Sequence, residues 1–339
     1  MKNEKYLSRS NTDCLKGICA IMVVLCHVCS RTGIGSALGL GPIYTAFGYW
    51  GVSGFMFMSG YGLVCSLIKN SDGGGEYLST FLRNRVLPVY LLMALLVVVY
   101  YVLKLYLKLE PPTTGELVQS FFFGRTVISF GWYLQSIVLI YMIFYVAAKV
   151  VLKQFYKPIG WPLSVAVGLG LLLYIGLCLV MRLDPTWYET AFSFLAGVAV
   201  ACYKTHVDGL LSTRKNTIIV LVVCTALFAV SFVLGSGPFI QGPFKIVSKM
   251  MSAVFFCLCW VAFMRLVSLE NSVTCFLGKL YLEIYIIQGA VYLLLRNKYW
   301  TVESQWIFFV AAIALVIVGA CLIKPLTTSF MNNMKLKTQ

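Results

Sequence analysis

The chain has 339 residues, of which 60% are hydrophobic and only 12% are charged. This composition excludes an ordinary soluble enzyme and indicates a protein that crosses a membrane several times. The formal net charge of +15 does not indicate a nucleic-acid-binding protein, because the basic residues stand singly at the ends of apolar runs. The twelve cysteines lie in or beside these runs, so we expect reduced packing residues rather than a disulfide framework.

Ten apolar runs are long enough to form helices that cross a bilayer. They lie approximately at residues 14–30, 44–68, 86–107, 128–152, 160–181, 187–203, 217–234, 244–268, 274–295 and 305–325. No gap between them has room for a separate core, and no convincing cleavage site follows the first run. The sequence therefore predicts a single all-α domain over residues 1–339, a polytopic membrane bundle of about ten transmembrane helices.

Lysine and arginine are unevenly divided between the two sides of this predicted bundle. The connections on the side of the N-terminus carry more of them than the connections on the other side, which include Lys245 and Lys249. Because cytoplasmic loops are enriched in Lys and Arg, we expect both termini to be cytoplasmic. An even number of spans requires the same arrangement.

The first apolar run holds two polar residues, Lys16 and His27, with ten residues between them. In a helix this spacing places His27 within about 20° of the face of Lys16 and about 16 Å further along the axis. Asp13 and Arg31 fall on nearly the same stripe. A histidine at this depth is a candidate for function, and the alternative is a structural hydrogen bond to a helix carbonyl or a serine.

The segment from Cys26 to Cys29 superficially suggests a metal site. Neighbouring positions of a helix point about 100° apart, so Cys26 and His27 cannot both bind one ion there. The only other histidine, His206, lies in a predicted loop. We therefore expect no metal.

The second and third runs contribute further polar candidates near the predicted cytoplasmic side. Ser59 follows a series of glycines that suits close helix packing, and the sequence offers no base that would make this serine a nucleophile. Arg83 and Arg85 precede the third run and are expected to lie near Lys16. Arginines there suit either phosphate binding or anchoring on lipid headgroups, and both roles stay open.

The ninth run places Tyr281, Tyr285 and Gln288 on one helical face, where they could donate hydrogen bonds to a substrate or simply pack. Glu283 lies deep in the same run. A buried carboxylate needs a partner or a proton, and the sequence offers Lys16 and Lys279 as partners.

Several motifs occur together in this chain and in a fixed order. They are the Lys16–His27 spacing, GVSGFMFMSGYGL at 51–63, FLRNRVLP at 81–88, Trp132-Tyr133-Leu134, Phe194 with Gly197, and LGKLYLEIYIIQ at 277–288. Together they resemble the acyltransferase-3 family of integral membrane acyltransferases. Lys16 stands where many members have Arg, and Gln288 where many have His.

The resemblance implies transfer of an acyl group, most often acetyl, from cytoplasmic acyl-CoA to a hydroxyl of a surface polysaccharide or lipid-linked sugar, in the inner membrane of a bacterium. Acyl-CoA would be a substrate, and no bound cofactor is expected. A neutral imidazole can accept the proton of the attacking hydroxyl. The residues expected to act are His27, Lys16 and Glu283 in catalysis, and Arg83, Arg85, Ser59, Tyr281, Tyr285, Gln288 and Trp132 in binding the substrate or CoA.

Two alternatives belong to other functional classes. A polar stripe through a helical bundle also suits a transporter of a polar glycan or lipid-linked intermediate, although the chain shows no clear internal repeat. The other alternative is a catalytically inactive member of the family that organises a polysaccharide-modifying complex. Gln288, in the place of a common His, leaves this alternative open.

Overall fold

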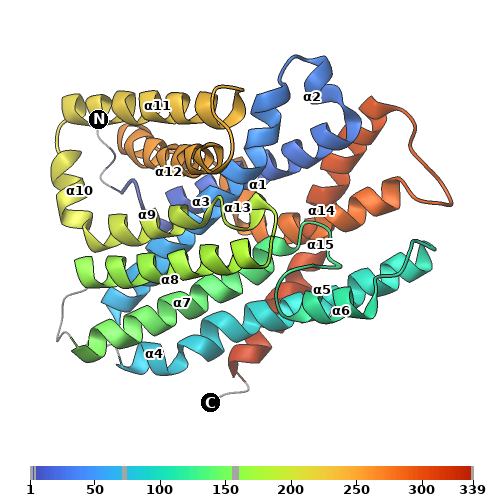
Figure 1. Cartoon of the computed structure of the whole chain (residues 1–339), viewed down its shortest axis with the longest axis horizontal. Coiled ribbons are helices and arrows are strands. Elements are labelled where there is room, and N and C mark those ends of the chain that lie inside the picture. Colours follow the sequence, from blue (N-terminus) through green and yellow to red (C-terminus); the bar gives the residue numbers. More distant parts are fainter. Residues whose placement is uncertain (1–2, 4, 71–74, 155–159, 337–339) are drawn as a thin grey trace.

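The computed structural model describes residues 3, 5–70, 75–154 and 160–336, and every regular element within them is a helix (Figure 1). The predicted all-α class is therefore confirmed. The elements are α1 (Arg9–Thr32), α2 (Ile34–Ala37), α3 (Gly41–Lys69), α4 (Gly75–Phe81), a π-helical turn (Leu82–Val86), α5 (Leu87–Tyr106), α6 (Thr114–Phe121), α7 (Trp132–Gln154), α8 (Trp161–Val180), a 3₁₀ turn (Pro185–Trp187), α9 (Ala191–Cys202), α10 (Lys204–Leu210), α11 (Arg214–Ser236), α12 (Pro243–Leu266), α13 (Ser272–Lys279), α14 (Tyr281–Leu295) and α15 (Gln305–Leu336).

Eight helical stretches in the described part of the chain are long and apolar enough to cross a bilayer. The pair α13–α14, which bends by 70°, would make a ninth. The sequence predicts about ten, and the difference lies at 187–203, where the structure has only the twelve-residue α9. At 1.5 Å per residue α9 is about 18 Å long, well short of the roughly 30 Å of a hydrocarbon core.

The short helix α9 packs directly on the backbone of α3. A Cβ on Gly60 would overlap the carbonyl oxygen of Phe194, and a Cβ on Gly197 would overlap the carbonyl oxygen of Phe57. Only glycine fits at both places, so the packing role expected of the glycine-rich segment is right for Gly60. Gly62 differs, because no atom lies within 4 Å of where its Cβ would be, and this residue lines a cavity.

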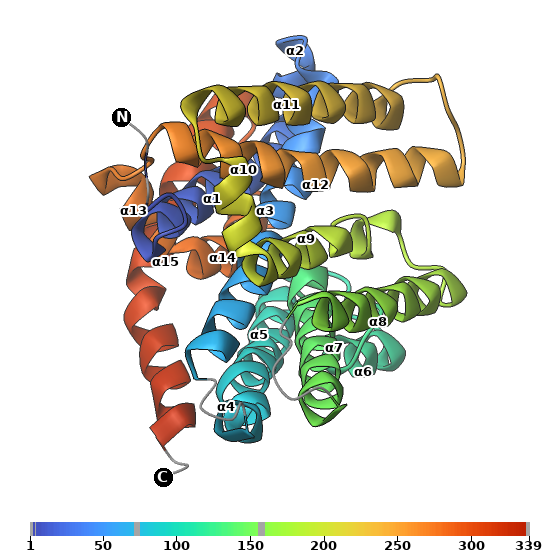
Figure 2. The ribbon, with the colours of Figure 1, turned by 90° about the vertical axis from the view of Figure 1, so that its left-hand side faces the viewer.

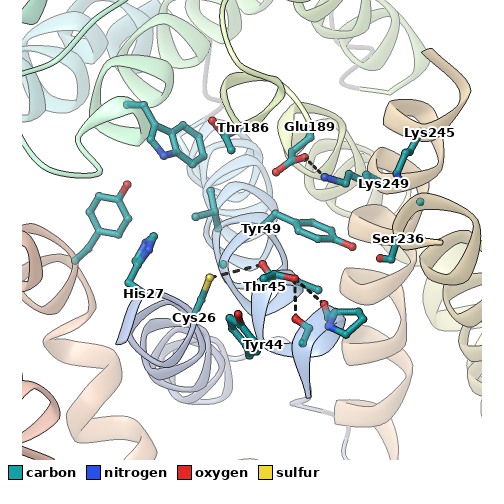
Figure 3. A pocket seen from close by; sticks show the side chains of 18 residues that line it. Cys26, His27, Tyr44, Thr45, Tyr49, Thr186, Glu189, Ser236, Lys245 and Lys249 are labelled. Atoms are coloured by element: carbon teal, nitrogen blue, oxygen red, sulfur yellow. Dashed lines mark hydrogen bonds and ion pairs between the residues drawn. The ribbon is translucent and has the colours of Figure 1, made fainter. Parts of the chain in front are cut away.

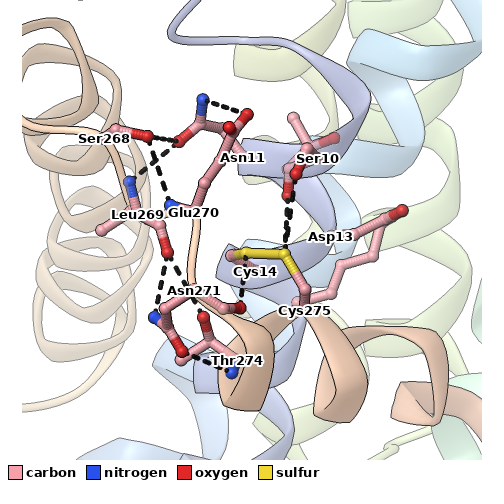
Figure 4. The surroundings of a disulfide bond; sticks show 12 residues. Ser10, Asn11, Asp13, Cys14, Ser268, Leu269, Glu270, Asn271, Thr274 and Cys275 are labelled. Atoms are coloured by element: carbon pink, nitrogen blue, oxygen red, sulfur yellow. Dashed lines mark hydrogen bonds and ion pairs between the residues drawn. A yellow bond between two sulfur atoms is a disulfide. The ribbon is translucent and has the colours of Figure 1, made fainter.

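Helices α1 and α13 are joined covalently. A disulfide links Cys14 to Cys275, which corrects the expectation that all cysteines are reduced, while the other ten are free (Figure 4). The Asn11 side chain accepts a hydrogen bond from the backbone N–H of Leu269 at 2.9 Å, beside this link. A hydropathy pattern cannot reveal this pairing, because the two cysteines are 261 residues apart.

The antiparallel pair α11–α12 lies beside the region of α1 and α3 (Figure 2). The N-terminal segment packs against the end of α12, where the Asn3 side chain donates to the carbonyl oxygen of Met264 at 3.1 Å. Eight spans would place both termini on the same side of the membrane, whereas nine would place them on opposite sides, so the side on which the termini lie stays a prediction. Lys2, Lys157 and Lys337, which are among the basic residues behind that prediction, lie outside the described residues.

Candidate active site

Helix α1 carries Lys16 and His27 into two different cavities. Lys16 lines a cavity of about 660 Å³ and His27 lines another of about 630 Å³, and the two share no lining residue. Eleven residues of helix separate their Cα atoms by about 16 Å. The polar stripe expected on α1 is therefore real at its two ends, where each end faces its own cavity.

The cavity at Lys16, here called the basic cavity, is strongly cationic. Four basic side chains line it, namely Arg9, Lys16, Lys69 and Arg85, and no carboxylate belongs to its described lining. Lys16 donates a hydrogen bond from Nζ to Asp13 Oδ1 at 2.8 Å. Asp13 Oδ2 also lies 3.9 Å from Arg9 Nε, so one carboxylate stands beside two of the four cations. The remaining positive charge suits a ligand with several negative charges.

Ser59 and Tyr281, both expected to bind substrate or CoA, also line the basic cavity. The Ser59 Oγ accepts a hydrogen bond from Tyr141 at 3.4 Å, and the Lys16 ammonium lies 5.5 Å from the centre of the Tyr281 ring. The Tyr281 hydroxyl makes no hydrogen bond within the described residues and stays available to a ligand.

Arg83 does not join this cluster. It lines a separate, mostly apolar groove together with Phe121 and Met142. Residues two apart in the π-helical turn Leu82–Val86 lie on nearly opposite sides, so Arg83 and Arg85 face different surroundings. The expected grouping of both arginines with Lys16 is therefore correct only for Arg85.

The second cavity, here called the His27 cavity, lies between α1, α3, α12 and α14 (Figure 3). Trp132 and Tyr285, both predicted to bind substrate, line it together with His27. The imidazole is half-buried, and its nitrogens make no hydrogen bond to any described residue. A structural role as a donor to a helix carbonyl or a serine is therefore not what the geometry indicates.

Phe130 packs against the imidazole of His27 and does not itself line the His27 cavity. Its ring stacks on His27 with 3.7 Å between ring centroids and 23° between planes. The backbone of Phe130 is in the left-handed region, with φ of 63°, which is uncommon for a bulky residue. Tyr285 donates a hydrogen bond to the Phe130 carbonyl oxygen and helps to fix this conformation. Nothing in the sequence singled out Phe130.

Four aromatic rings separate the two cavities, and we call them the aromatic partition: Phe55, Tyr133, Tyr281 and Tyr285. Tyr281 lines the basic cavity and Tyr285 lines the His27 cavity, one turn apart on α14. Phe55 lies 5.3 Å from Tyr281 and 6.0 Å from Tyr133, which in turn lies 5.1 Å from Tyr285, all between ring centroids. Tyr281 and Tyr285, one helical turn apart on α14, thus face different cavities.

Glu283 lies away from both cavities and has a different partner from those expected. Lys324 donates to its two carboxylate oxygens at 3.1 and 3.2 Å, and Thr327 donates a further hydrogen bond. The suggested partners, Lys16 and Lys279, make no ion pair with it. The carboxylate is buried, so this group ties α14 to α15.

Gln288 is fully buried and lines neither cavity. Its side-chain NH₂ donates to the Tyr285 carbonyl oxygen at 3.1 Å, and its oxygen accepts from Tyr292 at 3.5 Å. The predicted shared face of Tyr281, Tyr285 and Gln288 therefore divides into three different environments.

Glu189 is a site residue that sequence reasoning missed. It follows the 3₁₀ turn before α9, is only 4% exposed, and lines the His27 cavity. Its Oε2 lies 3.7 Å from the ammonium of Lys249 and has no hydrogen-bond partner among the described residues. Burial raises the pKa of the Glu189 carboxyl above its ordinary value, and the Lys249 charge opposes that shift. In the sequence, the only signal that pointed to Glu189 was its position as a single acidic residue at the edge of an apolar run.

No group of three or more His, Cys, Asp or Glu that could hold a metal ion occurs among the described residues. A family model described as an acyltransferase domain, that of the acyltransferase-3 family, matches residues 9–324. No curated protein and no solved structure matches the chain. The match covers nearly the whole chain, including every lining residue of the two cavities except Leu7, and the chain therefore belongs to the acyltransferase-3 family of membrane acyltransferases.

Proposed function

We propose that this protein transfers an acyl group, in the first place acetyl, from cytoplasmic acyl-CoA to a hydroxyl of a surface polysaccharide or lipid-linked sugar at a bacterial inner membrane. The observation that carries the proposal is the pair of cavities, one cationic and one holding His27, on either side of the aromatic partition. Such an arrangement suits two substrates that meet inside the protein from opposite sides.

The basic cavity is the place for the donor. Coenzyme A carries several phosphates, and arginine suits bidentate contact with phosphate oxygens while lysine acts as a point charge. Arg85, Lys69 and Arg9 can hold the phosphates, and Lys16 lies deeper on α1. Arg83, in its apolar groove, is assigned instead to anchoring at the membrane surface.

His27 is the general base in this proposal. An acceptor hydroxyl in the His27 cavity attacks the thioester carbonyl as its proton passes to an imidazole nitrogen. The carbon–sulfur bond then breaks, and the imidazolium returns the proton to the departing thiolate, so that CoA leaves as the thiol. The hydroxyl of Tyr281, which has no other hydrogen bond in the described part, can stabilise the oxyanion. For this step the thioester must reach past the aromatic partition.

The test uses inside-out membrane vesicles that contain their own lipid-linked sugars and are given radiolabelled acetyl-CoA. We expect His27→Ala to lower incorporation of label into the glycan fraction by about 100-fold or more, the usual contribution of a general base. Binding of acetyl-CoA to the purified variant should change by less than about twofold, because the basic cavity is intact.

The matched control is His206→Ala, since His206 is the only other histidine and lies in α10 beside Tyr203. This variant should retain full transfer. A fully active His27→Ala protein would refute the proposal. Passage of an unmodified glycan through the vesicle membrane without acetyl-CoA would support the transporter alternative instead.

A further inference from the structure

The wall of the His27 cavity opposite the imidazole carries a cluster of charged side chains. Figure 3 shows His27 on one side of the cavity, with Glu189, Lys245 and Lys249 on the other. Lys245 and Lys249 belong to the first two turns of α12, one turn apart on the same face. A substrate that fills the cavity therefore touches His27 at one end and these charges at the other.

The cluster has a net positive charge. The Lys249 ammonium lies 3.7 Å from Glu189 Oε2, whereas the Lys245 ammonium donates only to the carbonyl oxygen of Gly237, at 3.2 Å. Glu189, Lys245 and Lys249 are the only Asp, Glu, Lys or Arg side chains in the described lining. One ammonium is thus left without a compensating carboxylate, which favours an anion in the cavity.

Lys249 is held in place by the surrounding helices rather than free in a loop. The stem of Lys249 packs on α11, where a Cβ on Gly235 would lie only 3.0 Å from Lys249 Cγ. Its ammonium lies 6.0 Å from the centre of the Tyr49 ring. The buried carboxylate of Glu189 orients the same ammonium from the far side. A cation fixed in this way loses little conformational entropy when it binds a ligand.

The predicted topology also favours a ligand-binding role for Lys245 and Lys249. They lie on the side of the membrane that the distribution of Lys and Arg marks as non-cytoplasmic, where basic residues are depleted. An anchoring role on that side would run against the bias that sets the orientation. Binding of a ligand accounts for their position and for their place in the cavity wall.

We propose that the acceptor is an anionic saccharide, whose carboxylate or phosphate group is bound by Lys245 and Lys249 while one of its hydroxyls lies at His27. This inference rests on the function proposed above and narrows its substrate class. The aromatic faces of Trp132 and Tyr285, in the same cavity, suit packing against a sugar ring.

The test measures binding of three probes to the purified full-length protein in detergent by ligand-observed NMR. Phenyl β-D-glucuronide carries a carboxylate, glucose 1-phosphate carries a phosphate, and phenyl β-D-glucoside is the neutral counterpart. We expect at least one anionic probe to bind about tenfold more tightly than the glucoside, as a charge-assisted hydrogen bond provides. The preference should shrink as salt is added. The anion that binds more tightly distinguishes an acidic sugar from a sugar phosphate.

The variant Lys245→Met/Lys249→Met should lose the preference while its affinity for the glucoside changes by less than about twofold. The matched control is Lys298→Met, because Lys298 is exposed and lines neither cavity. Binding of acetyl-CoA at the basic cavity verifies that each variant is folded. Equal binding of neutral and anionic probes, or a preference that survives the double substitution, would overturn the inference.

The outcomes also separate this inference from the proposed function. Preferential anion binding in a protein that never transfers label from acetyl-CoA would support the anion site and contradict the acyltransferase proposal. Transfer of label to glycans by a protein that binds neutral and anionic probes equally would support the acyltransferase proposal and contradict the anion site.

Discussion

Phe130 determines the surroundings of the proposed base more than any other residue. Its ring covers one face of the His27 imidazole, and the Arg31 guanidinium lies 5.7 Å from the centre of the Phe130 ring on the way to the surface. Arg31 also lies 5.1 Å from the ring of Tyr292. His27 is therefore fixed by stacking rather than by hydrogen bonds, which leaves its nitrogens to the substrate.

We expect Phe130→Leu to lower kcat by about tenfold and to leave the KM for acetyl-CoA nearly unchanged. The smaller, unstacked side chain lets the imidazole rotate, and small misplacements of a catalytic group lower rates by up to about 100-fold. Steady-state kinetics with labelled acetyl-CoA measure both constants. The control is Phe239→Leu, since Phe239 is 70% exposed and lines neither cavity. An unchanged kcat in Phe130→Leu would contradict this positioning role.

At the scale of single residues, helical spacing identified Lys16 and His27 because both lie on one helix, whose period is known in advance. Spacing could not find Phe130 or Glu189, since their contacts join segments that are far apart in the sequence. It also suggested the wrong partners for Glu283, because Lys324 belongs to the next helix and its distance depends on how α14 and α15 pack.

At the scale of helices, a few polar side-chain contacts link the otherwise apolar surfaces of neighbouring helices. Glu283 links α14 to α15 through Lys324, and its side chain is 2% exposed against 39% for Lys324. Removing one member of such a pair leaves a charge in a poorly solvated place, which is more destabilising than removing both.

We expect Lys324→Met to destabilise the protein by about 3 kcal/mol, because the Glu283 carboxylate loses its partner. The double variant Glu283→Gln/Lys324→Met should recover a substantial part of that loss. Thermal unfolding in detergent measures the free-energy differences. As a control, Arg125→Met breaks the exposed pair with Glu116 and should change stability by less than about 1 kcal/mol. Strictly additive effects of the two substitutions at Glu283 and Lys324 would exclude the coupling.

At the scale of the whole molecule, the two cavities are expected to open to opposite sides of the membrane. Each has a native cysteine in its lining, Cys65 in the basic cavity and Cys26 in the His27 cavity. Cys65 is exposed and unpaired, so it reports which side the basic cavity faces.

A membrane-impermeant thiol reagent should modify Cys65 in inside-out vesicles and not in intact cells. Saturating acetyl-CoA should protect this residue, because the ligand fills the same cavity. Mass spectrometry of the peptide gives the extent of labelling, and Cys65→Ser gives the background. Labelling of Cys65 from outside intact cells would reverse the predicted orientation.

The architecture could be predicted from the sequence to the extent that it depends on hydropathy. Long apolar runs gave the all-α class and most of the spans, because a bilayer imposes a minimum length on each helix. Hydropathy failed at α9, whose apolar residues are buried by α3 and α8 instead of facing lipid. The disulfide between Cys14 and Cys275 and the bend between α13 and α14 depend on tertiary packing, which no local pattern records.

The aromatic partition has a consequence for the electric field in this protein. If water enters both cavities, most of the membrane potential falls across the aromatic partition rather than across the full bilayer. A negative oxygen that forms beside Tyr281 or Tyr285 then experiences a steep local voltage gradient. The membrane potential of the cell would then act directly on the reacting atoms.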